Sequence, residues 1–264
     1  MSSPGRIMSG HAITDSASEW EAARKELLAA EKEATAALAK VAEQRRALPW
    51  LRVRPSGKGS ADTENDYVFQ TAESGTDVTL KQMAATTPTG SLLIYHLMFD
   101  ADWEKPCSSC SMWIDCLNGI YPHLLQKTAV VAVAVAPPDK LRALAEAKGW
   151  SIPLVSSLNS AFSCDFGVRF TPEQVADGAL AYNYGRKAFV SVMPGFSVFQ
   201  LEPADDDGEI FHTYSAYARG LEPLNAVWGV LDSLPFGRNE AKGMDWTKHK
   251  SEYDVVTIES AKLS

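Results

Sequence analysis

Two cysteines three residues apart are the most chemically suggestive feature of this 264-residue sequence. Cys107-Ser108-Ser109-Cys110 follows an apolar run at 92–99 and a short loop, and it opens a segment with helical periodicity. At a helix N-terminus, unpaired N–H groups and the helix dipole favour an anion, so Cys107 should ionise more easily than a free cysteine of pKa about 8.5. The spacing puts the Cys110 sulfur on the same helical face. This arrangement predicts thiol-disulfide exchange, in which Cys107 attacks and Cys110 resolves the mixed disulfide.

A zinc site is the main alternative for this pair, because a C-x-x-C motif also makes half of a four-ligand site. His96 and His123 are the histidines that could join the cysteines in such a site. The sequence has neither a second C-x-x-C nor an H-x-x-x-H motif to supply the remaining ligands, so we predict no metal and no cofactor. Cys116 fits a small buried side chain, whereas Cys164 lies in an irregular segment that can fold back over the dithiol. The alternative to an enzyme is a non-catalytic binding or metal-holding module.

The composition is that of an acidic globular protein. Subtracting 33 acidic from 25 basic side chains gives a formal charge of -8, and no Lys/Arg cluster is longer than Arg45-Arg46. A nucleic-acid-binding protein should carry a basic face, so we expect no nucleic-acid partner. The longest apolar run, at 129–136, is too short for a membrane-spanning helix of about 20 residues. With no secretory signal evident, we expect a cytoplasmic protein with reduced thiols and no membrane partner.

The N-terminal part predicts one long helix. Residues 1–15 are polar or small without periodicity, and we expect them to be disordered. From Ser16 and Glu19 onward, apolar side chains recur at helical intervals until Pro49 ends the pattern. This helical extension, residues 16–50, is either a surface helix packed on the main domain or the dimerisation arm of a homodimer.

The remaining chain predicts an α/β domain over residues 51–237 and a polar tail over residues 238–264. Runs at 67–70 and 78–80 predict a hairpin. Strands are expected at 92–99 and 129–136, alternating with helices at 107–126 and 139–148, the latter capped by Gly149. Strands separated by helices indicate a parallel sheet with helices on its faces.

The second half of the domain is regular only near its end. Residues 153–187 show little pattern. Runs at 196–201 and 210–217, on either side of an acidic turn, predict a hairpin, and an apolar stripe predicts a helix at 222–233.

Met193-Pro194-Gly195 stands directly before this hairpin. Here the sequence resembles the thioredoxin fold, whose members place a cis proline just before the hairpin and against the dithiol. The resemblance implies a cis Met193-Pro194 bond that presents backbone groups to an extended substrate.

Several segments resemble one family of that superfamily more closely. The matching residues are Tyr95-His96-Leu97-Met98-Phe99, Asp102-Trp103, Cys107-Ser108-Ser109-Cys110, Trp113, Asp115, Asn118-Gly119 and the run from Phe211 to Gly220. They are similar to the thioredoxin-like family of unknown function usually described as predicted dithiol-disulfide oxidoreductases, over roughly Trp20 to Gly237. The resemblance implies a thioredoxin-like central sheet flanked by helices. The substrate-binding candidates are Trp103, Trp113, Met193, Pro194, His212, Tyr214 and Arg219.

The sequence departs from two better-known patterns of the superfamily. Classical thioredoxins have Trp before the first cysteine and Gly-Pro between the thiols, where this chain has Pro106 and Ser108-Ser109. Peroxiredoxins carry a Pro-x-x-x-Thr/Ser-x-x-Cys segment, where this chain has Asp100 and Glu104. Thiol-disulfide exchange is therefore expected rather than the usual peroxiredoxin mechanism.

Strand alternation suggests how the last candidates are arranged. It places His212, Tyr214 and Ala216 on one face of their strand, with Tyr217 and Arg219 on the other. Elsewhere, Asp115 is either a proton acceptor for the resolving thiol or a solvated helix carboxylate. The expected partners are a thiol or disulfide substrate, either a protein or a small molecule, and a second redox partner that reduces or oxidises the dithiol.

Overall fold

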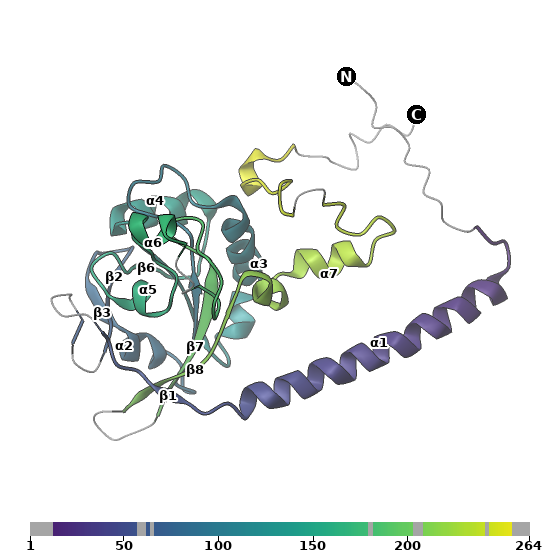
Figure 1. Cartoon of the computed structure of the whole chain (residues 1–264), viewed down its shortest axis with the longest axis horizontal. Helices are drawn as coiled ribbons and strands as arrows, with labels where there is room; N and C mark the ends of the chain where they lie inside the picture. The colour runs from purple at the N-terminus through teal and green to yellow at the C-terminus, as the bar shows by residue number, and fades with distance from the viewer. Residues whose placement is uncertain are drawn as a thin grey trace. The chain divides into compact units, whose positions relative to one another are not determined.

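The computed structural model describes residues 13–56, 62–63, 66–178, 182–202, 208–240 and 243–254. The chain divides after Leu48 into two compact units, which Figure 1 shows. The predictions for residues 1–12, for the acidic turn at 203–207 and for the end of the tail at 255–264 lie outside the described residues.

The first unit contains the predicted long helix, α1 (Ala17–Arg46). Ser16 caps it, with its hydroxyl accepting a hydrogen bond from the backbone N–H of Glu19 at 3.2 Å. The helix ends shortly before Pro49, whose ring cannot continue helical hydrogen bonding. No α1 side chain is buried, and the apolar side chains of Trp20 and Leu38 are 62% and 68% exposed.

The second unit is built on one mixed sheet. Its described strands are β1 (Leu51–Arg52), β2 (Val68–Thr71), β3 (Asp77–Thr79), β4 (Ser91–His96), β5 (Ala129–Ala134), β6 (Leu154–Ser156), β7 (Gly195–Leu201) and β8 (Ile210–Tyr217). Their order across the sheet is β1-β8-β7-β4-β5-β6-β2-β3. The strands β4, β5 and β6 are parallel, and the other neighbours are antiparallel. The predicted parallel sheet is therefore confirmed only at its centre, because hairpins extend it on both sides.

The centre of this sheet has the thioredoxin-like arrangement. The helix α3 (Ser108–Leu124) connects the parallel strands β4 and β5, and the β7-β8 hairpin lies antiparallel beside β4. The last described α-helix, α7 (Ala226–Asp232), follows the hairpin. The fold class predicted from the sequence is confirmed.

Helices cover both faces of the sheet (Figure 1). The helices α3 and α4 (Pro138–Lys148) share one hydrophobic cluster with the sheet, and α2 (Leu80–Ala84) and α5 (Phe162–Asp165) share another. Alternation along β4 divides its side chains between them: Tyr95 belongs to the α3 cluster and Ile94 to the α2 cluster. Tyr95 therefore lies on the same side of the sheet as the dithiol helix.

Two central elements form for reasons visible in the sequence. All six residues of β5 are buried, as expected for an uninterrupted apolar run in a parallel strand covered on both faces. The helix α4 starts with Pro138 in its first turn and ends at Gly149, whose φ of 66° gives the left-handed cap predicted there.

The prediction at 222–233 was too long at its start. Residues Ala218–Leu224 form a 3₁₀ helix, η1, which contains Pro223. The α-helix begins only after Asn225, whose side-chain oxygen accepts from the N–H of Val227 at 2.8 Å. Because Pro223 has no N–H to donate, it favours this break.

The poorly patterned stretch at 153–187 contains short elements that the sequence analysis missed. They are β6, α5 and α6 (Pro172–Ala176). The start of α6 was readable, because Thr171 and Gln174 form a capping box and Pro172 takes the first helical position, where proline is favoured.

Candidate active site

The two cysteines lie at the start of α3, as predicted. Cys107 is the residue immediately before the helix and is half-buried, whereas Cys110 lies in the first turn and is 2% exposed. The Cys107 N–H donates to the Met98 carbonyl at 3.0 Å, and the Cys107 carbonyl accepts from the Ser111 N–H at 3.1 Å. These bonds hold the first sulfur where β4 passes into α3. All four cysteines are free thiols.

The two thiols have opposite ionisation tendencies. A hydrogen bond from the Cys110 thiol lowers the pKa of Cys107 to about 6, helped by the backbone N–H groups of Cys110 and Ser109 and opposed by burial. Burial, followed by the interaction with Cys107, raises the pKa of Cys110 well above its usual value. One thiol is therefore a thiolate near neutral pH, and its neighbour keeps its proton.

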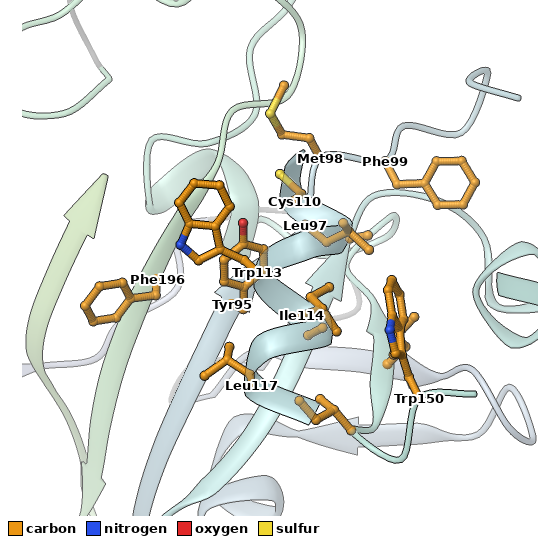
Figure 2. Packing of buried hydrophobic residues seen from close by; sticks show 14 of the residues in the cluster. Tyr95, Leu97, Met98, Phe99, Cys110, Trp113, Ile114, Leu117, Trp150 and Phe196 are labelled. Carbon is orange, nitrogen blue, oxygen red and sulfur yellow. The ribbon is translucent and has the colours of Figure 1, made fainter. Parts of the chain in front are cut away.

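Tyr95 is a site residue whose role the sequence analysis missed. Its side chain is 1% exposed and lies beneath the first turn of α3. Figure 2 shows its hydroxyl oxygen directed toward the turn that carries Cys110. The Tyr95 hydroxyl donates to the Cys110 sulfur, which opposes the effect of burial on that thiol. Burial itself raises the pKa of Tyr95, so the hydroxyl remains a donor.

A largely apolar pocket of about 420 Å³ opens beside both sulfurs. Its lining comes from β4 and the loop after it, α3, the segment before β7, η1, α7 and the segment after α7. The lining residues are Tyr95, Met98, Cys107, Ser109, Cys110, Trp113, Phe189, Pro194, Ala218, Arg219, Leu221, Glu222, Trp228, Arg238, Glu240, Gly243 and Met244. Five of the predicted site residues thus meet at one pocket, namely the two cysteines, Trp113, Pro194 and Arg219.

Trp113 is both a core residue and part of the pocket wall. Its side chain is 6% exposed, and its ring centroid lies 4.5 Å from that of Trp228. The Trp113 indole N–H donates to the Leu221 carbonyl at 2.9 Å. Trp113 therefore packs in the core and also lines the pocket.

Pro194 lines the pocket, but the expectation of a cis bond is wrong. The Met193-Pro194 peptide is trans, which is the usual form of X-Pro bonds. The Tyr182 hydroxyl donates to the Pro194 carbonyl at 2.7 Å and accepts from the Ala218 N–H at 2.9 Å. This tyrosine ties the proline to the start of η1, and it too was missed by the sequence analysis.

Two predicted residues lie beside the pocket rather than in its wall. Met193 is 2% exposed and packs in a small separate cluster with Tyr182. Trp103 is half-buried against the α3 cluster, and its carbonyl accepts from the Lys140 ammonium at 3.2 Å. Neither side chain is among the residues that line the pocket.

A β-bulge corrects the predicted arrangement on β8. Val198 pairs with Tyr214 and Phe199 with His212, so Thr213 is an extra residue in the ladder. His212 and Tyr214 consequently lie on opposite faces, and the expectation of one shared face is wrong. Tyr214 packs on Phe196, 5.7 Å between ring centroids, on the α3 side.

His212 lines a second cavity, of about 400 Å³, together with Tyr67, Asp165 and Tyr184. Its Nε2 lies 2.7 Å from the Ser215 hydroxyl, and its ring contacts Phe199 in the α2 cluster. This face is opposite the dithiol. The predicted alternation failed also for Arg219, which belongs to η1 and not to the strand.

The remaining cysteines lie apart from the pair. The Cys116 thiol donates to the Asn225 side-chain oxygen at 3.6 Å and is half-buried. Cys164 is exposed on α5, which covers the opposite face of the sheet. Asp115 accepts from the Trp150 indole N–H at 2.7 Å, so it serves as a structural acceptor between α3 and the end of α4.

Two further features concern ligands and membranes. Within the described ranges, no three His, Cys, Asp or Glu side chains converge as a metal site would require. In the same ranges no helix combines the length and the apolar character needed to cross a membrane.

The fold and the site define a thioredoxin-like α/β protein with a dithiol at a helix N-terminus. The chain belongs to the family described as "Bacterial protein of unknown function (DUF899)", whose model matches residues 8–253. No curated protein matches the sequence at a significant level.

Among solved structures, the chain is similar to peroxiredoxins and to a thiol peroxidase. A cysteine mutant of peroxiredoxin Q from Xanthomonas campestris is 17% identical, with 62% of this chain and 89% of that chain covered and a TM-score of 0.42. Peroxidoxin BcpB from Mycobacterium tuberculosis is 14% identical, with coverages of 63% and 88% and a TM-score of 0.40. A PrxQ mutant from Xylella fastidiosa is 18% identical, with coverages of 66% and 98% and a TM-score of 0.37.

Proposed function

We propose that this protein is a thiol-disulfide oxidoreductase that uses the Cys107-Cys110 pair. The observation that carries the proposal is the unequal environment of the two sulfurs. Cys107 is half-buried at the pocket with a pKa lowered to about 6, and Cys110 is buried behind it with a raised pKa. Nucleophile and resolving thiol in dithiol chemistry differ in this way. The resemblance of the segments around the dithiol to predicted dithiol-disulfide oxidoreductases supports the same assignment.

The chemistry follows from these environments. The Cys107 thiolate attacks one sulfur of a disulfide, that disulfide breaks, and the departing thiolate takes up a proton. Once Cys107 is in the mixed disulfide, the Cys110 thiol no longer donates to a thiolate. Cys110 then loses its proton and attacks the Cys107 sulfur, which releases the second thiol and leaves the intramolecular disulfide. A second dithiol or disulfide partner resets the pair.

The test is a trapping experiment with the full-length chain. Cys110→Ser should accumulate a mixed disulfide on Cys107, because no second thiol remains in position to release it. Cys107→Ser should form none, and Cys116→Ser should turn over as the parent does. Mass spectrometry of the tryptic peptides identifies the modified cysteine. An adduct on Cys116 or Cys164 in the Cys110→Ser variant would show that the role assignment is wrong.

The competing hypothesis is a non-catalytic module that binds metal through the same pair. It predicts about one equivalent of zinc or iron in the purified protein, with Cys107→Ser and Cys110→Ser each releasing it. The oxidoreductase proposal predicts far less than one equivalent and a fold that survives a chelator. Elemental analysis together with circular dichroism separates the two.

A further inference from the structure

The pocket beside Cys107 offers an apolar interior. Trp113, Trp228 and Leu221 form its inner wall, and each is less than 10% exposed, at 6%, 4% and 2%. The Trp113 N–H is already bonded to the Leu221 carbonyl. An apolar group that enters the pocket therefore replaces water against indole and aliphatic surface, which is favourable at about 25 cal/mol per Å².

The charged side chains that line the pocket all have partners within the chain. Glu222 accepts from Arg219 at 2.7 Å and from Arg238 at 3.1 Å. Arg238 also pairs with Asp232 at 2.7 Å, and Glu240 accepts from the Trp246 indole at 3.0 Å. A charged substrate would meet both signs of charge, already paired, and would compete with these pairs for a partner. The lining thus disfavours substrates with free carboxylates or ammonium groups.

The segment after α7 restricts the size of what can approach. Met244 forms part of the pocket wall, and three residues later the chain is bonded to the first turn of α3. The Ser108 hydroxyl donates to the Thr247 carbonyl at 3.2 Å, and the Ser109 and Thr247 hydroxyls lie 2.8 Å apart. The dithiol therefore opens into a pocket of small-molecule size.

We propose that this pocket selects small, uncharged, apolar disulfides, with Phe189 at its mouth as a specificity-determining residue. The inference rests on the proposed thiol exchange and adds the substrate class. In one turnover the reduced pair gives two electrons to the substrate R–S–S–R. The substrate S–S bond breaks, the Cys107–Cys110 bond forms, and two R–SH molecules leave, one with the Cys110 proton and one with a proton from solvent. No reductant other than the protein's own dithiol is needed for this single turnover.

The test is single-turnover kinetics of the reduced full-length protein with three probes. These are 4,4′-dithiodipyridine, which is aromatic and uncharged at neutral pH, glutathione disulfide, which is charged, and insulin, which is a protein disulfide. The rate constant for the protein with each probe is divided by the rate constant for dithiothreitol with the same probe. This ratio removes the difference in intrinsic reactivity among the three disulfides. The uncharged aromatic probe should give a ratio about tenfold or more above the other two, as expected for burial of one aromatic ring.

Phe189→Ala tests the pocket without threatening the fold, because the Phe189 side chain is 70% exposed. It should lower the ratio for 4,4′-dithiodipyridine about threefold or more and lower that for glutathione disulfide by a smaller factor. Tyr184→Ala is the matched control, an 80% exposed aromatic residue that lines the cavity on the other face. It should change neither ratio.

The outcomes separate the substrate class from the underlying chemistry. A ratio for glutathione disulfide or insulin that equals or exceeds that for the aromatic probe overturns the substrate class but retains thiol exchange. An effect of Tyr184→Ala as large as that of Phe189→Ala overturns the assignment of Phe189. If Cys107 reacts with none of the three probes, the proposed function fails as well.

Discussion

The Tyr95 hydroxyl donates a hydrogen bond to the Cys110 sulfur from beneath the first turn of α3. Cys110 in turn donates to Cys107. The three groups form a line from the buried sheet to the pocket, in which each donor stabilises negative charge on the next acceptor. We therefore expect Tyr95 to stabilise the Cys110 thiolate that must form when the mixed disulfide is resolved.

Tyr95→Phe should therefore slow resolution and spare the first attack. A hydrogen bond to a charged group contributes about 1.5–3 kcal/mol, so the mixed disulfide should persist about tenfold longer or more. Acid quenching followed by mass spectrometry measures its lifetime. Tyr121→Phe, which removes a hydroxyl near the C-terminal end of α3, is the control and should leave this lifetime unchanged. Equal slowing of attack and resolution would argue against the task assigned to Tyr95.

The lowered pKa of Cys107 is predicted to depend on its neighbour. Alkylation of Cys107 should rise with pH around a midpoint of about 6, because only the thiolate reacts. Cys110→Ala removes the main stabilising hydrogen bond and leaves burial, so the midpoint should move up. Cys110→Ser keeps a hydroxyl donor and should move it less. The measurement is the iodoacetamide rate against pH in a background lacking Cys116 and Cys164, and a midpoint that stays at its parent value in Cys110→Ala would refute this cause.

The dithiol was predictable from sequence because its geometry is local. Cys107 and Cys110 are separated by less than one helical turn, and an apolar strand precedes the helix that carries them. Helix boundaries such as Gly149 were equally local, since a single residue supplies the left-handed cap.

The rest of the site depends on contacts between distant segments. In the sequence, Tyr95 is one residue of an apolar run with no feature that marks it. Its position near Cys110 arises only because β4 lies beneath α3 in the fold. Thr247 reaches Ser109 across 138 residues of chain, and nothing in the spacing of either indicates it. The failed prediction for His212 has a different cause, because one extra residue at Thr213 reverses the faces of everything before it.

Replacement of Gly195, at the start of β7 and next to Pro194, is predicted to destabilise the fold. A Cβ there would lie 2.6 Å from the Tyr217 ring, whose hydroxyl donates to the Phe166 carbonyl at 3.0 Å. The Tyr217 ring is fixed by its backbone on one side and by this hydrogen bond on the other, so it cannot easily move away from an added Cβ. Gly195→Ala should therefore lower the free energy of unfolding by about 1–3 kcal/mol. Urea denaturation measures this cost.

Gly119→Ala is the matched control for this substitution. Gly119 is exposed on α3 and has no atom within 4 Å of an added Cβ, so alanine should raise the free energy of unfolding by about 0.5–1 kcal/mol. A Gly195→Ala protein as stable as the parent would mean that the Tyr217 ring is free to move aside.

The last prediction concerns acid stability and the buried His96. Its Nε2 lies 2.8 Å from the Ser197 hydroxyl, and its Nδ1 has no hydrogen-bond partner. Burial lowers the pKa of His96 to about 3, whereas a histidine in an unfolded chain has a pKa of about 6.5. Below pH 6.5 the unfolded chain therefore binds a proton that the folded protein excludes. The contribution of neutral His96 is complete above that pH and declines as the pH falls toward 3, by up to about 1.4 kcal/mol per pH unit.

In His96→Gln the glutamine side chain keeps a polar partner for Ser197 but has no group that titrates. The free energy of unfolding should therefore decrease less steeply in this variant than in the parent between pH 6.5 and about 4.5. Burial lowers the pKa of His212 as well, and adding His212→Gln should flatten this decrease further. Urea denaturation at successive pH values measures both slopes. If His96→Gln loses stability with falling pH as steeply as the parent, the buried imidazole already carries its proton in the folded state, and the packing of His96 against Phe162 would have to tolerate a charge.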